Sequence, residues 1–206
     1  MTKAEMIEAV VKGMVGAILV VAVPMGKAIL RQSKILFAKA KIESQKKIQV
    51  ILDSIRSELH VDRVEIFEYS NGENTLGGFP FLYGTMTFES TANHIKSTKA
   101  EMIRFPTSWF SMILSPLLPT NVKFCLWEQS GDCVTDDKSR VTDREAGRIM
   151  AGYNIEASIL IKFTHNIGDG LLSISNHNES LDLSTDQWEK LLADVHKIWY
   201  HLKLKR

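Results

Sequence analysis

The chain has 206 residues, enough for one globular domain and an appended segment, and its 45% hydrophobic content is typical of a folded protein rather than a disordered one. Its formal net charge is only +1, so any preference for a charged partner must come from a local cluster.

An apolar segment, Val10 to Leu30, lies near the start of the chain. Its uncharged part, residues 13–26, is shorter than the about 20 residues that span a bilayer. Lys12 and Lys27 can extend their ammonium groups toward opposite headgroup layers, which restores a usable apolar length of roughly 30 Å. We therefore predict a membrane anchor over residues 1–31, with a helix buried among the subunits of an assembly as the alternative.

Small residues in this segment suit either environment, because they permit close contact between helices. A cleaved signal peptide fits poorly, since Glu5 and Glu8 precede the apolar run. Pro24 is expected to kink a membrane helix without ending it. The residues expected to form the membrane helix are Val10, Gly13, Gly16, Leu19, Val20, Pro24 and Leu30.

A basic helical stalk is predicted at residues 32–46. Its positive charges favour anionic lipid headgroups and place the large C-terminal part in the cytoplasm, or alternatively the protein belongs to a virion. Nucleic acid is not an expected partner, since Phe37 is the only aromatic residue in the run and no DNA-binding motif accompanies it. The basic residues in and around the stalk are Lys27, Arg31, Lys34, Lys39, Lys41, Lys46 and Lys47.

The remainder, residues 47–206, has alternating helix and strand signals. Apolar residues at helical spacing predict an amphipathic helix that ends near His60. β-branched and aromatic residues predict strands at 61–69 and 84–89. Prolines divide the stretch between Phe105 and Thr120 into a short helix and a loop. A further strand is expected at 122–127.

The last third of the chain is clearer. Thr142 with Glu145 forms a capping-box pattern for a helix that runs to about Tyr153, and strands follow at 158–163 and 171–176. Ser184 and Gln187 cap a final helix. Its apolar stripe comprises Trp188, Leu191, Leu192, Val195, Ile198, Trp199 and Leu202.

This order predicts an α+β domain. An antiparallel sheet carries the first and last helices on one face, and the irregular middle covers the other face. A long apolar helix precedes the domain.

With these elements placed, residues 45–204 resemble a GAF-type domain, a fold shared with PAS-like sensor modules. The resemblance is carried by IRSELHVDRVEIFEYSNGENTLGGFPFLYGTMTFE (residues 55–89) and by Gly152-Tyr153-Asn154-Ile155 before a strand. The match is to GAF-like domains of phage and microbial membrane-anchored proteins. It implies a sensing or partner-binding module, but the Asn-Lys…Phe…Asp-Glu set of cyclic-nucleotide-binding members has no match here.

A narrower similarity is to the holins of T-even phages. They share the chain length, one N-terminal membrane helix, a C-terminal α+β domain and a Leu-Gly-Gly-aromatic-Pro stretch, found here at Leu76 to Pro80. The basic stalk departs from them, because it predicts a cytoplasmic domain where those holins have a periplasmic one.

One loop is a candidate ligand or partner site. Its glycines let backbone amides approach a ligand, and its aromatic residues can line an apolar pocket, although it has no P-loop pattern. A structural turn or protein-contact surface is the alternative. The candidate residues are Tyr69, Asn71, Gly72, Gly77, Gly78, Phe79 and Tyr83.

No catalytic, cofactor or metal site is expected. The six histidines have no metal-ligand spacing, and no nucleophile motif is present. Cys125 and Cys133 are expected to be free thiols, although a hairpin between them would allow a disulfide.

The sequence thus predicts a non-enzymatic, membrane-associated, phage-type protein. It would form homo-oligomers through its N-terminal helix and use a GAF-like domain for sensing or partner contact. A holin-like membrane-lesion protein and a structural virion component are the alternatives.

Overall fold

The computed structural model describes the backbone of residues 3–70, 83–119, 121–163 and 170–203, and the side chains within these ranges except at 3–29, 70 and 203. The chain divides into two compact units, Met1–Ser44 and Gln45–Arg206. Helix α1 (Lys3–Leu59) contributes to both units and continues past Pro24.

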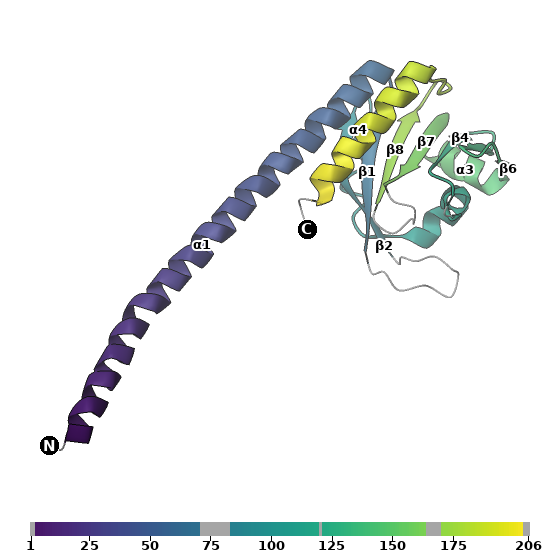
Figure 1. The fold of residues 1–206 in the computed structure, drawn as a ribbon. Coiled ribbons are helices and arrows are strands. Elements are labelled where there is room, and N and C mark those ends of the chain that lie inside the picture. Colours follow the sequence, from purple (N-terminus) through teal and green to yellow (C-terminus); the bar gives the residue numbers. More distant parts are fainter. Residues whose placement is uncertain (1–2, 71–82, 120, 164–169, 204–206) are drawn as a thin grey trace. The chain divides into compact units, whose positions relative to one another are not determined.

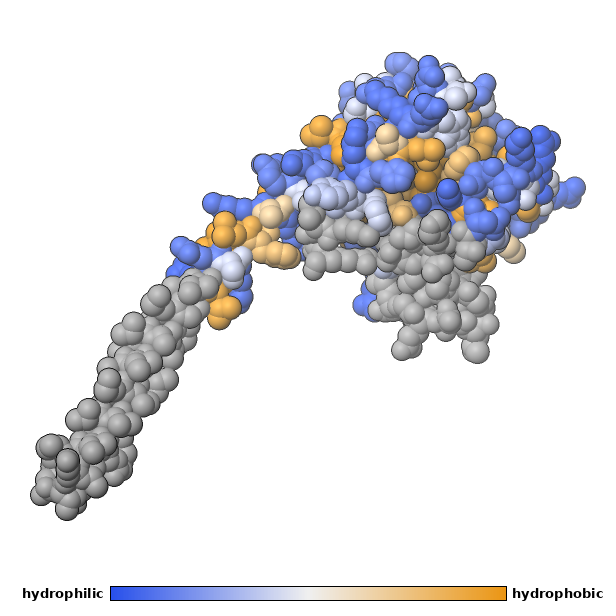
Figure 2. All heavy atoms as spheres, in the orientation of Figure 1, coloured by the Kyte–Doolittle hydropathy of each residue, from blue (hydrophilic) through white to orange (hydrophobic). Residues whose placement is uncertain are grey.

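The first unit consists of the beginning of α1. In the described part of the chain, no helix is both long and apolar enough to cross a membrane. The side chains of the predicted membrane residues Val10, Gly13, Gly16, Leu19, Val20 and Pro24 lie outside the described residues, so the anchor over 1–31 stays a prediction. Leu30 is described and is 62% exposed, and further exposed apolar side chains follow it on α1 (Figure 2).

The second unit is an α+β domain around one antiparallel sheet, as predicted (Figure 1). Its strand order is β3-β2-β1-β8-β7-β4-β5-β6. The strands are β1 (Arg63–Ser70), β2 (Tyr83–Thr91), β3 (Phe105–Pro106), β4 (Phe124–Glu128), β5 (Asp132–Thr135), β6 (Arg140–Thr142), β7 (Ala157–Lys162) and β8 (Gly170–Asn176). The helices after α1 are η1 (Thr107–Phe110), α2 (Ser111–Leu114), η2 (Ser115–Leu117), α3 (Arg144–Gly152) and α4 (Thr185–Lys203).

One face of the sheet, the helix face, is covered by the end of α1 and by α4. Apolar residues at every second strand position pack against both helices, as the predicted element order requires. The sheet contributes Val64, Ile66, Ala157, Ile159, Ile161, Leu172 and Ile174, and the helices contribute Ile48, Leu52, Ile55, Leu191, Val195 and Ile198.

The opposite face, the pocket face, is covered by the irregular middle of the chain and by α3. Two buried hydrogen-bonding side chains hold this cover to the sheet. Trp127 Nε1 donates to the Ile113 carbonyl at 2.9 Å. Lys162 Nζ donates to the carbonyls of Leu117 and Pro119 at 3.0 and 2.7 Å, and burial lowers the pKa of Lys162.

The two predicted helix caps differ in outcome. Ser184 and Gln187 form the predicted capping box: Ser184 N donates to Gln187 Oε1 at 2.9 Å, and Gln187 N donates to Ser184 Oγ at 3.3 Å. The cap predicted at Thr142 is wrong, since Asp143 is the N-cap and accepts from the amides of Glu145 and Ala146. Thr142 belongs to β6, where its hydroxyl donates to Asp132 Oδ1 at 2.7 Å.

Three short strands were not predicted. They are β3, with two residues, and the β5 and β6 strands that extend the sheet beyond β4. β3 and β6 are shorter than the four to eight residues that make a strand pattern readable, and β5, with four residues, is at the lower limit.

Candidate functional site

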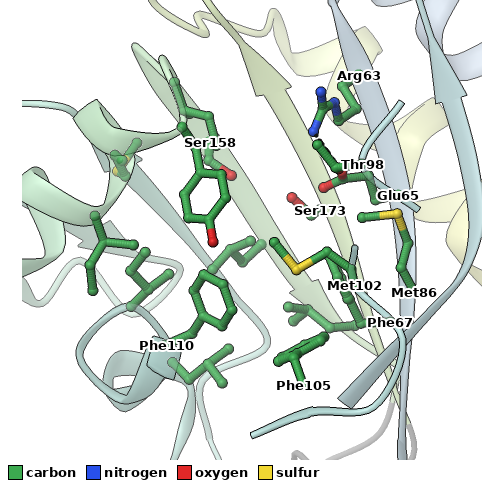
Figure 3. A pocket seen from close by; sticks show the side chains of 18 of the residues that line it. Arg63, Glu65, Phe67, Met86, Thr98, Met102, Phe105, Phe110, Ser158 and Ser173 are labelled. Carbon is green, nitrogen blue, oxygen red and sulfur yellow. Dashed lines mark hydrogen bonds and ion pairs between the residues drawn. The ribbon is translucent and has the colours of Figure 1, made fainter. Parts of the chain in front are cut away.

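A cavity of about 90 Å³ lies between the pocket face and its cover (Figure 3). The sheet lines it with residues of β1, β2, β7 and β8, namely Arg63, Glu65, Phe67, Tyr69, Met86, Ser158, Leu160, Leu171 and Ser173. The edge strand β3 adds Phe105, and the cover supplies Thr98, Met102, Phe110, Ile113, Leu114, Ile149, Met150, Tyr153 and Ile155.

Strand alternation explains why β1 contributes four lining residues. Successive side chains of a strand point to opposite faces, so Val64 and Ile66 enter the helix-face core while their neighbours face the cavity. Strand β2, which pairs with β1, carries a β-bulge that shifts the register between the two strands. Ile66 pairs with Phe88 but Phe67 pairs with Met86, which leaves Thr87 as the extra residue. The bulge thereby brings Met86 to the cavity although Phe88 packs on the helix face.

The larger part of the cavity wall is apolar and aromatic. The Phe105 ring makes edge-to-face contacts with both Phe67 and Phe110, at centroid distances of 5.7 and 5.2 Å. The ring of Phe110 is 5.9 Å from that of Tyr153. Aromatic pairs in this geometry are held by complementary ring quadrupoles as well as by burial. This end of the cavity therefore suits an apolar group.

The other end is polar and is organised by Arg63. Its Nη1 donates to Glu65 Oε1 at 3.2 Å and to Thr98 Oγ1 at 2.8 Å, and its Nη2 donates to the Lys96 carbonyl at 2.8 Å. Glu89 Oε1 lies 3.9 Å from Arg63 Nε and accepts from the Thr98 amide at 3.0 Å. The side chains of Arg63, Glu65 and Glu89 are each less than a tenth exposed, so one guanidinium is buried with two carboxyl groups.

Burial raises the pKa of Glu65 to about 7. Arg63 opposes this shift through its positive charge and hydrogen bond, the Glu89 carboxylate adds to it, and a hydrogen bond with the Ser173 hydroxyl opposes it. The Glu65 carboxyl group is therefore poised to gain or lose a proton near neutral pH, inside a cavity.

Two serines complete the polar end. Ser173 pairs directly with Glu65 across β1 and β8, and Ser158 lies on the next strand, β7, one diagonal step away. Both residues are buried, at 7% and 6% exposure. The arrangement places a carboxyl group and two hydroxyl groups on three adjacent strands, at one end of an apolar cavity (Figure 3). Such a site can bind a small molecule with one polar end.

Metal and thiol chemistry find no support at this site. Among the described residues, no group of three or more His, Cys, Asp or Glu side chains is arranged to hold a metal ion. Cys125 and Cys133 are free, buried and outside the cavity lining. They occupy diagonal positions on β4 and β5, and burial raises the pKa of Cys125, which keeps its thiol protonated.

The predicted loop site coincides only in part with this cavity. Tyr69 lines the cavity, and burial raises its pKa above the ordinary tyrosine value. Tyr83 lies on β2, with the guanidinium carbon of Arg104 4.8 Å from its ring centroid. The remaining predicted loop residues Asn71, Gly72, Gly77, Gly78 and Phe79 lie outside the described residues.

Sequence analysis missed Arg63 and Glu65. They occupy alternate positions within a strand otherwise rich in apolar residues, a pattern that ordinarily indicates a solvent-facing side of a sheet. The cover that buries this side of the strand lies more than 30 residues later in the sequence, so the sequence around Arg63 and Glu65 does not indicate that they are buried.

Comparison with known proteins supports the fold and leaves the function open. No family model matches the sequence, and no curated protein matches it. Among solved structures, a phycoerythrobilin-bound GAF domain from a cyanobacterial phytochrome is 16% identical, with a TM-score of 0.60 over 87% of this chain and 95% of that one. A phycocyanobilin-bound GAF domain from a cyanobacterial phytochrome is 15% identical, with a TM-score of 0.60 over 84% and 94% of the two chains.

A third similar structure is the chromophore-binding domain of a bacteriophytochrome from R. palustris. It is 11% identical and gives a TM-score of 0.59 over 85% of this chain and 62% of that one. At these identities the similarity establishes the fold alone. The globular part of the chain therefore has a GAF-like fold, which confirms the expected resemblance at the level of the domain.

Proposed function

We propose that this protein is a non-enzymatic sensor in which the GAF-like domain binds a small molecule and the N-terminal helix holds copies of the chain together at a membrane. The observation that carries the sensing role is the cavity on the pocket face. It joins an aromatic wall to a buried carboxyl group and two buried hydroxyl groups. Burial of polar groups lowers the stability of the fold unless they form hydrogen bonds, and a bound ligand would form hydrogen bonds with them.

The GAF-like fold adds to this proposal by analogy only. The structures it resembles include domains with a bound phycoerythrobilin or phycocyanobilin, held by those proteins. One fold hosts many activities, so the ligand of the present chain must be argued from its own cavity.

The membrane and assembly roles are supported by the character of α1. Large apolar side chains on its described part are solvent-exposed, among them Leu30, Leu36 and Phe37 at 62%, 67% and 54%. Lysines 34, 39 and 41 stand between and beside them. Exposed apolar groups interleaved with lysines are suited to a headgroup layer or to contact with further copies of α1. A cytoplasmic location of the domain follows from the positive-inside tendency and is part of the proposal.

A phage origin belongs to the same proposal and is supported by the resemblance of residues 55–89 to phage GAF-like domains. Within it, a holin-like protein would form membrane lesions through α1, and a virion component would bury the apolar segment among copies of itself. Expression in bacteria separates these alternatives, because a holin-like protein lyses the host and a virion component does not require detergent for extraction.

The sensing role is tested by a thermal-shift screen of small molecules on the full chain in detergent. Compounds that bind the cavity are expected to raise the melting temperature of the natural protein but not of Ser158→Leu, which fills the cavity. Ser180→Leu, at an exposed position, is the matched control and should keep the shifts. A screen without such compounds, or with shifts that Ser158→Leu retains, would contradict the proposal.

The membrane role is tested with Val20→Arg, which puts a guanidinium near the middle of the apolar segment at a cost of about 2.5–3.5 kcal/mol on insertion scales. Sedimentation with vesicles that contain anionic lipid should fall. Val50→Arg, at a position on α1 that is 67% exposed, is the control and should sediment as before. Unchanged sedimentation of Val20→Arg would count against an inserted helix.

A further inference from the structure

The polar end of the cavity specifies the chemical class of its ligand. Resting on the proposed small-molecule site, we infer that the ligand is a small amine whose ammonium group binds at Glu65, Ser158 and Ser173 and whose apolar body lies against the aromatic wall.

The charges in and beside the cavity favour a cation over an anion. Arg63 carries the only positive charge among the described lining residues. Glu65, Thr98 and the Lys96 carbonyl already accept its Nη hydrogen bonds, and its Nε, which has no hydrogen-bond partner among the described residues, lies 3.9 Å from Glu89 Oε1. Two carboxyl groups, Glu65 and Glu89, accompany this one guanidinium. A ligand carboxylate or phosphate would have to approach Glu65, the carboxyl group that lines the cavity, whereas an ammonium group can pair with its carboxylate.

The hydrogen-bonding groups point to the same class. An ammonium group has three N–H donors and no acceptor. The cavity offers three acceptors on adjacent strands: the Glu65 carboxylate on β1, the Ser173 hydroxyl opposite it on β8, and the Ser158 hydroxyl one diagonal step further on β7. The Ser158 hydroxyl has no hydrogen-bond partner within the part of the chain that the structure describes. A bound amine would supply that partner.

The apolar wall sets the body of the ligand. Phe67, Phe105 and Phe110 form a continuous set of ring contacts, and the Met86 and Met102 side chains lie between them and the polar end (Figure 3). Aromatic faces and thioethers are favourable surroundings for the methylene groups next to an ammonium. A cavity of about 90 Å³ is smaller than the about 150 Å³ of an engineered cavity that binds benzene, so the ligand is small, with an apolar body no larger than a short alkyl chain or a single ring.

The test compares three probes of one shape on the full chain in detergent: n-butylamine, 1-butanol and butyrate. Isothermal titration at pH 8 keeps the amine protonated and the Glu65 carboxyl group largely ionised. Butylamine should bind about tenfold or more tightly than butanol, since hydrogen bonds to charged groups are the stronger ones, and butyrate should not bind.

Two variants locate the ammonium group. Glu65→Gln keeps the shape but removes the charge, and it should weaken butylamine binding by about tenfold to a hundredfold while leaving butanol binding nearly unchanged. Ser158→Ala removes one acceptor and should weaken butylamine binding by about threefold to tenfold. Glu128→Gln, at an exposed position on β4, is the matched control and should bind butylamine as the natural protein does.

The outcomes separate this inference from the proposed site. Preferential binding of butyrate or butanol, or butylamine binding that Glu65→Gln leaves intact, would overturn the amine and leave the small-molecule site standing. Absence of binding by all three probes would overturn the amine, and the thermal-shift screen with Ser158→Leu would then decide separately whether the site exists.

Discussion

The two faces of the sheet are built from the same strands but differ in what they bury. On the helix face, Val64, Ile66 and Ile159 are fully buried among apolar side chains of two regular helices. On the pocket face, Arg63 and Glu65 are nearly as buried, at 7% and 5% exposure, beneath a cover of short helices and irregular chain. Each β1 residue thus belongs to one of two environments that alternate along the strand.

This difference separates stability from function. Apolar burial stabilises a fold roughly in proportion to area, whereas burial of an ion pair seldom adds net stability, because desolvation offsets the attraction. The helix face is therefore expected to supply most of the stability of the domain. The pocket face is expected to contribute less, because it contains a cavity and a buried ion pair. The following predictions set the two faces against each other.

The largest effect is expected from the helix face. Ile198 of α4 is fully buried, so Ile198→Ala should lower the free energy of unfolding by about 2–5 kcal/mol, the range for large-to-small substitutions in a core. Denaturant titration measures it. Tyr200→Ala, at a position on the same helix that is 60% exposed, is the control and should change stability little. Equal effects of the two variants would contradict the division between the faces.

The pH dependence of stability should reveal the cost of the pocket face. Below about pH 4.5, Glu65 is protonated in both folded and unfolded chains; between there and about pH 7 it ionises only when unfolded, so this residue makes the domain less stable as pH rises. Glu65→Gln removes this contribution. The stability of the variant relative to the natural protein should therefore rise by roughly 1–3 kcal/mol from pH 4 to pH 8.

Both proteins are measured by denaturant titration at each pH. The contributions of the other titrating groups are the same in both proteins and cancel in the difference between their stabilities. A difference that stays constant between pH 4 and pH 8 would mean that the Glu65 carboxyl group is not desolvated in the folded protein. The helix face, whose core is apolar, gives no comparable signal.

Much of the helix face was readable from the sequence because its signals are local. The box at Ser184 and Gln187 and the stripe that includes Leu191 and Ile198 lie within one helix, so helical periodicity and cap chemistry are sufficient to predict them. The cap at α3 was misassigned by one residue, because Thr142 and Asp143 are both good cap residues. Only the pairing of Thr142 within β6 distinguishes them.

The cavity was not readable, because its residues come from distant segments. Ser173 lies beside β1 only through the strand order that places β8 next to it, and Thr98 reaches Arg63 from the cover. The predicted loop shares only Tyr69 with the cavity. Alternation along 61–69 predicts which residues share a face, but a charged face usually indicates solvent, so the sequence pattern alone points away from a buried site.

A smaller loss of stability is expected where the cover is held to the sheet. Trp127 is fully buried, and its indole N–H donates to the Ile113 carbonyl of α2. Trp127→Phe keeps an aromatic ring but removes this donor, and it should cost about 1–2 kcal/mol. Ligand binding at the cavity should weaken as well, because Ile113 lines it. A variant that loses neither stability nor binding would show that the cover is held in place by other contacts.

The smallest effect is expected from filling the cavity, and two neighbouring residues of β7 make the comparison direct. Ala157 enters the helix-face core and Ser158 lines the cavity. Ala157→Leu overpacks a filled core and should cost about 1–3 kcal/mol. Ser158→Leu adds a side chain of the same size where empty volume can receive it, and the added apolar burial offsets the lost hydroxyl, so stability should change by less than about 1 kcal/mol. Denaturant titration of the two variants ranks them; a Ser158→Leu variant as damaged as Ala157→Leu would mean that the pocket face is packed as tightly as the helix face and has no room for a ligand.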